Sequence, residues 1–194
     1  MNQFNDTLLR DTVQNMSKPI QMNPNDTDEY TIQGFVTNAT LNDTSTYHLH
    51  SVNEFKRGDF TYLSDNKFYM VTDDVIHERG SKYKAKIEYC NYVNVMTKTE
   101  QVIAGFVAGR PYYETVTTVI GNFVGIIKQR ALVIPSTSGV AVGNTETILM
   151  LKDTTQAKEY YTVNKEFEYD GKSWKVQGLS NINKGILEIR LTTV

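Results

Sequence analysis

The sequence contains a single cysteine, Cys90, among its 194 residues. This excludes an intramolecular disulfide and any metal site built from several cysteines. A chain without disulfides is typical of a reducing compartment. Because Cys90 lies in the strand-like segment KIEYCNYVNV, we expect a buried, unreactive thiol rather than a nucleophile.

Long apolar runs and an excess of positive charge are also missing. No apolar segment is long enough for a transmembrane helix, and the segment MNQFNDTLLRDTVQNM lacks the basic and apolar regions of a signal peptide. The formal net charge is −2, which disfavours a protein that grips a phosphate backbone with clustered lysine and arginine. Such a chain could still line a channel through which DNA slides.

Motifs for catalysis are absent as well. The sequence has no G-x-S-x-G elbow, no phosphate-binding loop and no zinc-binding helix motif. His48 and His50 lie two residues apart on a strand-like segment and so face the same side, but the sequence suggests no third metal ligand. We therefore expect no enzyme activity, no metal and no cofactor.

What the sequence does contain is a succession of strand-like segments. The stretches GDFTYLSDNKFYMVTDD (58–74) and EFEYDGKSWKVQG (166–178) each indicate a β-hairpin, and Asp170-Gly171 is a two-residue turn that needs positive φ at Gly171. No helix is indicated after residue 20, and no βαβ alternation occurs. The pattern predicts a mainly β fold of antiparallel β-barrel or β-sandwich modules with one short N-terminal helix.

The aromatic residues of the two hairpins allow two interpretations. Phe60, Tyr62, Phe68, Tyr69 and Trp174 could form a stacking platform for sugars or bases. Their spacing on strands favours core positions instead. Trp174 alternates with Val176 directly after the Asp170-Gly171 turn, so we predict that Trp174 anchors the core.

Three units are expected along the chain. Residues 1–22 form a helix and an arm, residues 23–110 a β domain, and residues 111–194 a second β domain. The boundary is placed at Gly109-Arg110-Pro111, where glycine and proline interrupt the pattern, although an internal crossover would interrupt it too. The helix, within residues 2–16, is too short to be stable alone. We expect it to dock on a partner; the alternative is packing on its own domain.

Several segments resemble the neck proteins of tailed bacteriophages, the head-to-tail connectors of the head-closure or adaptor type. They are RPYYE (110–114), the loop before Thr147, and YYTVNKEFEYDGKSWKVQGLSNINKGILEIRL; in the first half they are GDFTYLSDNKFYMVTDD and YKAKIEYCN. The resemblance implies a β-barrel or β-sandwich core, no enzyme activity, and assembly as a ring on the portal vertex of the DNA-filled head.

The same resemblance implies partners and a location. These are a homo-oligomeric ring, portal or adaptor and tail proteins of the same virion, and DNA that passes through the lumen without sequence-specific binding. No membrane is involved, and the virion would assemble in the host bacterial cytoplasm. The assembly interface is expected at the helix and at the tip of the first hairpin, with Phe4, Leu8, Leu9, Asp65 and Asn66. The alternatives are a phage tail component or a monomeric β-sandwich module that binds a receptor or carbohydrate.

Overall fold

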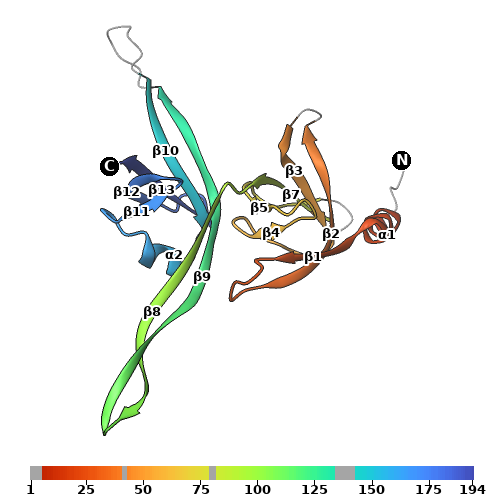
Figure 1. Cartoon of the computed structure of the whole chain (residues 1–194). Coiled ribbons are helices and arrows are strands. Elements are labelled where there is room, and N and C mark those ends of the chain that lie inside the picture. The colour runs from red at the N-terminus through yellow and green to blue at the C-terminus, as the bar shows by residue number, and fades with distance from the viewer. Residues whose placement is uncertain (1–5, 41–42, 79–81, 134–142) are drawn as a thin grey trace.

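The fold is mainly β, with 63% of residues in strands, which confirms the predicted fold class. A computed structural model describes residues 6–40, 43–78, 82–133 and 143–194 (Figure 1). The strands form two antiparallel sheets, one closed into a six-stranded barrel and one curved into a half-barrel, accompanied by two short helices. No helix in these ranges is long and apolar enough to cross a bilayer.

The first half of the chain forms the closed barrel. Its strands follow the order β3-β2-β1-β4-β5-β7, and pairing of β3 with β7 closes the ring, while the short β6 adds to an edge of β7. Ile32, Leu49 and Ile87 point inward and are almost inaccessible. The strand bounds are β1 (Lys18–Met22), β2 (Tyr30–Thr40), β3 (Asp43–Ser51), β4 (Phe60–Tyr62), β5 (Phe68–Val71), β6 (Ile76–Glu78) and β7 (Lys82–Tyr89).

The second half forms the half-barrel, with the strand order β11-β12-β13-β10-β9-β8. The short helix α2 packs on this sheet, because Ala157 in the helix and Tyr161 at its end are fully buried in the same core as Trp174. The bounds are β8 (Tyr92–Val107), β9 (Arg110–Val133), β10 (Gly143–Lys152), α2 (Thr155–Tyr160), β11 (Glu166–Tyr169), β12 (Lys172–Ser180) and β13 (Ile186–Thr193).

A separate apolar cluster joins the barrel to the half-barrel. Phe60 and Met70 of the barrel pack there with Ile126 and Ile148 of the half-barrel. Cys90, in the link between β7 and β8, is buried in this cluster, and burial raises the pKa of its thiol far above the ordinary value. The two bodies therefore share a buried apolar interface rather than a flexible linker.

The expected domain boundary is corrected by the sheet topology. The chain passes from barrel to half-barrel between β7 and β8, whereas Gly109-Arg110 lies at the turn of the β8–β9 hairpin. A hairpin turn and a domain boundary interrupt an apolar pattern in the same way, so the pattern did not separate them. Residues 1–22 are not a separate unit either, because β1 is a strand of the barrel.

The two helices differ in how well the sequence predicted them. Helix α1 (Asp6–Met16) lies within the expected 2–16 segment and packs beside β2, with Val13 buried. This contact agrees with the alternative in which the helix packs on its own domain. Helix α2 lies where only strands were expected. It begins because the Thr154 side chain caps it by accepting a hydrogen bond from the Ala157 N–H.

Candidate assembly surface

A long β-ribbon projects from the half-barrel (Figure 1). It is made by β8 and β9, which pair from Tyr92–Gly125 out to Val107–Arg110 (Figure 1). Every residue from 100 to 117 is exposed to solvent except the half-buried Gly105. We call residues 100–117 the arm. Two-stranded ribbons on their own are marginally stable in water, so the arm is suited to a partner that covers it.

The turn of the arm has a defined geometry. Ala108 and Gly109 have φ of 49° and 76°, and positive φ at both central residues is the signature of a type I′ hairpin turn. Gly105 pairs with Tyr112, and a Cβ at Gly105 would lie 2.7 Å from the Tyr112 ring. The tyrosine ring therefore lies against the glycine backbone and stiffens this part of the ribbon.

The two faces of the arm differ in chemistry. Residues directly opposite in an antiparallel pair share a face, and successive pairs alternate. The register places Ile103 with Tyr113 and Phe106 with Pro111 on one face, which we call the apolar face of the arm. The other face carries three charged side chains, Glu100, Arg110 and Glu114. Its pairs are Glu100–Val116, Val102–Glu114, Gly105–Tyr112 and Val107–Arg110.

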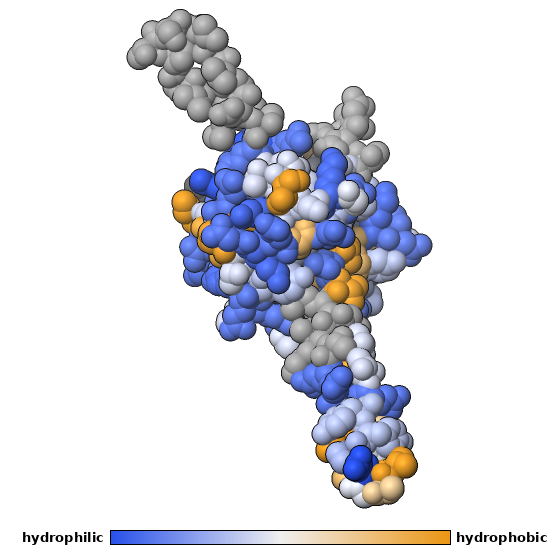
Figure 2. All heavy atoms as spheres, turned by 60° about the vertical axis from the view of Figure 1, so that its left-hand side comes forward, coloured by the Kyte–Doolittle hydropathy of each residue, from blue (hydrophilic) through white to orange (hydrophobic). Residues whose placement is uncertain are grey.

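The apolar side chains of the arm are strongly exposed. Phe106 is 68% exposed, Tyr113 57% and Ile103 54%. Figure 2 shows apolar side chains gathered at the free end of the arm. Monomeric proteins rarely leave contiguous apolar surface in solvent, and such patches commonly mark interaction sites. The arm is therefore a candidate surface for assembly.

A groove on the barrel is a second candidate surface. It has a volume of about 660 Å³ and lies between the end of α1, strands β1 and β2, and the β4–β5 turn. Its apolar lining includes Met16, Ile20, Phe35 and Tyr62, of which Met16 is 59% and Tyr62 46% exposed. Lys18 and Asp65 add one charge of each sign to the lining.

The structure places the residues of the expected interface in different situations. Phe4 lies outside the described residues, and Leu8 and Leu9 belong to α1, but their side chains are not among those described. Asp65 and Asn66 form the exposed β4–β5 turn, where Asp65 accepts a hydrogen bond of 2.6 Å from the Tyr69 hydroxyl. Asp65 also lines the barrel groove.

The aromatic residues of the two hairpins do not form a stacking platform. Phe60, Tyr69 and Trp174 are 3%, 1% and 8% exposed and belong to three different apolar clusters, whereas Tyr62 is 46% exposed. The Asp170-Gly171 turn has φ of 52° and 67°, as its type requires. Most aromatic residues of the hairpins thus serve packing, and Tyr62 lines the barrel groove.

The described residues His48 and His50 contact aromatic and hydroxyl groups. His50 stacks on Phe35, with ring centroids 4.8 Å apart, and its Nε2 lies 3.0 Å from the Thr37 hydroxyl. The His48 ring is 6.3 Å from that of His50. Among the described residues, no group of three or more His, Cys, Asp or Glu side chains is placed to hold a metal ion.

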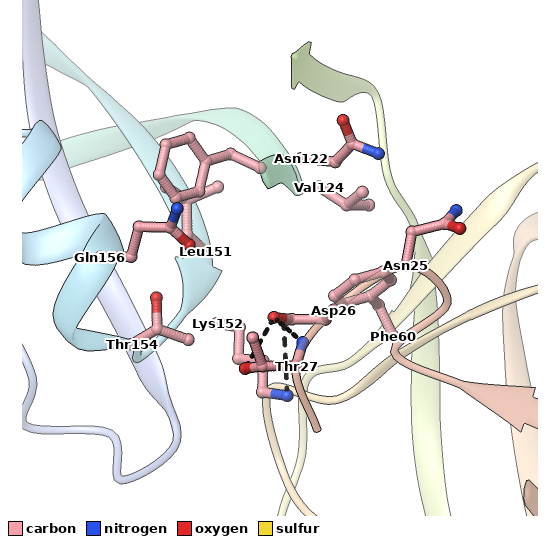
Figure 3. A pocket seen from close by; sticks show the side chains of 11 residues that line it. Asn25, Asp26, Thr27, Phe60, Asn122, Val124, Leu151, Lys152, Thr154 and Gln156 are labelled. Atoms are coloured by element: carbon pink, nitrogen blue, oxygen red, sulfur yellow. Dashed lines mark hydrogen bonds and ion pairs between the residues drawn. The ribbon is translucent and has the colours of Figure 1, made fainter. Parts of the chain in front are cut away.

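A small cavity of about 60 Å³ lies at the junction of the two bodies (Figure 3). Asp26 and Phe60 of the barrel face Lys152 and Thr154 of the half-barrel across it. This volume holds only a few water molecules. The Lys152 ammonium pairs with Asp26, and also with Asp28 and Asp59 outside the cavity lining. The cluster therefore acts as an ionic clamp between the bodies rather than a substrate site.

Sequence reasoning missed both the arm and the groove. The signal for the arm was present in the uninterrupted β pattern from 92 to 133, which contains only one turn, at Ala108-Gly109. Two strands of this length that pair with each other must extend well beyond a body of ordinary thickness. The groove has no local signal, because its lining comes from four separate parts of the chain.

Comparison with known proteins adds one finding. A family model described as the YomX C-terminal domain matches residues 81–192, more than half of the chain. YomX is a Bacillus prophage protein, and the family is phage-derived. The matched segment starts at β7 and includes the half-barrel with its arm. No curated protein and no solved structure is significantly similar to the chain.

Proposed function

The chain belongs to the YomX C-terminal domain family, and from this premise we propose that it is a structural protein forming a ring in the neck of a tailed phage. The ring would connect the portal vertex of the DNA-filled head to the tail. The phage-derived family supports a phage structural protein. The observation that carries the assembly role is the arm, whose apolar face is exposed from Ile103 to Tyr113.

The architecture suits a ring subunit in two ways. The buried junction and the Lys152 clamp hold the barrel and the half-barrel in one orientation, so a contact made by one body fixes the position of the other. The arm extends away from both bodies and can reach a neighbour (Figure 1). Contacts between different surfaces of identical subunits generate rings when the rotation closes.

The charge of the chain is compatible with passage of DNA through such a ring. The formal net charge is −2, and the arm carries two acidic side chains, Glu100 and Glu114, and one basic side chain, Arg110. A lumen without a dense basic lining does not hold a phosphate backbone tightly. In this proposal the portal or adaptor and the tail proteins are the other partners, and DNA is not bound by sequence.

The competing functions differ in what they would require. A monomeric module for a receptor or carbohydrate would need an aromatic surface on its compact body, whereas Phe60, Tyr69 and Trp174 are buried and the exposed Phe106 and Tyr113 lie on the projecting arm. A tail component would use the same rigid body and arm. Neck and tail are therefore separated by location rather than by fold.

The test is to delete the gene in a phage or prophage that encodes the protein, and to locate a tagged copy by gold labelling in electron micrographs. A neck ring predicts DNA-filled heads and free tails after deletion, with gold at the head–tail junction in the complemented phage. Gold along or at the tip of the tail would assign the protein to the tail. Tagged protein absent from purified virions would refute the structural role altogether.

A further inference from the structure

We propose that the arm of one copy docks into the barrel groove of a second copy of this chain. This inference rests on the proposed ring and identifies the contact that would build it. The groove has an apolar lining of Met16, Ile20, Phe35 and Tyr62, and Lys18 and Asp65 also line it. The inserted element is the apolar face of the arm, formed by Ile103, Phe106, Pro111 and Tyr113.

The apolar face of the arm offers area for such a contact. At roughly 200 Å² per aromatic side chain, the exposed fractions of Phe106 and Tyr113 on the apolar face amount to about 250 Å². Ile103, which is 54% exposed, adds aliphatic surface on the same face. Backbone and polar atoms of the ribbon add to this area, and specific interfaces bury roughly 800 Å² per partner.

The groove matches the arm in chemistry. Its apolar lining receives the apolar face of the arm. Its two charges are opposite in sign to the charges that the other face of the arm carries. Arg110 at the turn is complementary to Asp65, and Glu114 further along is complementary to Lys18. Two arms that paired tip to tip about a two-fold axis would instead bring their Arg110 side chains together, which is unfavourable.

The contact must join two copies, because the arm points away from its own groove. In Figure 1 the free end of the β8–β9 hairpin and helix α1, which borders the groove, lie on opposite sides of the molecule. The ribbon from Met96 to Val107 spans about 40 Å at roughly 3.4 Å per residue, enough to cross to a neighbouring subunit. A contact between two different surfaces is heterologous, and it generates a ring when the rotation from one subunit to the next closes.

Site-specific cross-linking tests the contact directly. Val107→Cys places a thiol at the end of the arm, and Ser64→Cys places one in the groove lining; the native Cys90 is 3% exposed and stays unreactive. The two single variants are expressed alone and together in the phage, and assembled particles are oxidised. The proposal predicts a disulfide-linked dimer only when both variants are present, and a covalent ladder from the double variant.

The cross-linking test has a matched control and outcomes that would overturn the proposal. Asn181→Cys is exposed on the half-barrel, away from the groove, and should give no dimer with Val107→Cys. Dimers from Val107→Cys alone would show arm-to-arm pairing and overturn the proposal. Cross-linking of the arm to another virion protein, or no cross-link in assembled particles, would overturn it too.

A second variant separates loss of contact from loss of folding. Phe106→Ser removes the most exposed aromatic side chain of the arm, and Ile182→Ser is its control, because Ile182 is 91% exposed outside both surfaces. Phe106→Ser should weaken self-association at least tenfold in sedimentation of concentrated protein or in assembled particles, with an unchanged melting temperature. Equal association of the two variants would overturn the inference.

The two proposals fail in different ways. If gold labelling places the protein in the neck but the arm does not cross-link to the groove, the ring is built by another contact. If the cross-link forms but the protein lies in the tail or outside the virion, the contact stands and the neck function falls. Each result therefore decides one proposal without relying on the other.

Discussion

Replacing Lys152 with methionine should loosen the junction between barrel and half-barrel. Lys152 ends β10 of the half-barrel, and its ammonium lies 3.5 Å from Asp59 Oδ1 and 3.9 Å from Asp26 Oδ2, both of them barrel residues. Asp28 accepts a hydrogen bond from the same ammonium. The side chains of Lys152 and Asp59 are only 15% and 4% exposed, so water screens this pair weakly.

The size of the effect follows from what Asp59 retains. Removing one partner of a buried ion pair costs about 3–5 kcal/mol when the other charge is left uncompensated. The Asp59 carboxylate still accepts hydrogen bonds from Asn23 Nδ2 at 2.9 Å, the Tyr30 hydroxyl at 2.6 Å and the Lys56 N–H at 2.8 Å. We therefore expect a smaller loss, about 2–3 kcal/mol, the size of one charged hydrogen bond.

Urea unfolding measures this loss and its origin. Far-UV circular dichroism follows both bodies, whereas the fluorescence of Trp174 reports on the half-barrel core alone. In the native chain the two transitions should coincide, and in Lys152→Met they should move apart. Lys128→Met is the control: its ammonium lies 3.3 Å from Glu88 Oε2 but its side chain is 42% exposed, so we expect a loss under about 1 kcal/mol. Equal shifts of the urea midpoint in the two variants would refute the reasoning.

Three further predictions concern the core, the junction and high pH. Trp174→Ala should cost about 3–5 kcal/mol in urea unfolding followed by circular dichroism, unless the native emission already peaks at the solvent-exposed wavelength. Gly58→Ala should lower the free energy of unfolding by more than about 2 kcal/mol, because Gly58 has φ 89° and a Cβ there would lie 1.9 Å from the Gly185 carbonyl oxygen. The control Gly109→Ala, at the open turn with φ 76°, should lower it by about 1 kcal/mol. Equal losses would contradict the close contact at Gly58. Burial raises the pKa of Tyr161 above its ordinary value of 10.0, so its contribution to stability is fully present below about pH 10 and is lost as the pH rises further. Between about pH 8 and pH 11, the urea midpoint of Tyr161→Phe should therefore fall less than the midpoint of the native chain. Equal falls would count against this prediction.

Local chemistry predicted the elements that depend on neighbouring residues. Asp170-Gly171 forms the expected turn because only a few residue types accept positive φ, and glycine accepts it without strain. The alternation in SKYKAKIEY gives Ala85 and Ile87 buried positions in β7, as a half-buried strand requires. These signals are contained within a few residues, so the mainly β fold could be predicted from the sequence.

Features that depend on distant residues could not be predicted in this way. The barrel closes because β3 pairs with β7 from Thr46–Glu88 to Ser51–Tyr83, and no local pattern specifies that register. The short helix α2 is stabilised by burial of Ala157 and Tyr161 in the half-barrel core rather than by helix propensity. A segment of this length has too little local preference to identify it.

The arm shows where an apolar pattern misleads. Ile103 and Phe106 are residue types that are common in core strands. Strand propensity mainly measures how well a side chain fits a half-buried surface, so it does not tell whether the same chain or another chain buries it. The sequence indicates that one face of the ribbon is apolar but does not say which chain covers it. In the structure that face stands in solvent, so the same pattern predicts assembly rather than an internal core.

An exposed apolar ribbon is a hazard to an unassembled subunit, because its free edge can pair with any other chain. The arm carries two devices that limit such pairing. The register of the β8–β9 ribbon shifts between Met96 and Thr97, before the arm, and again between Ile103 and Gly105 within it; bulges of this kind twist an edge away from flat pairing. Its second face carries Glu100, Arg110 and Glu114, which oppose unspecific stacking of ribbons. An apolar face protected in this way is suited to one complementary groove, and a partner that lacks the matching charges should be rejected even if it offers apolar surface.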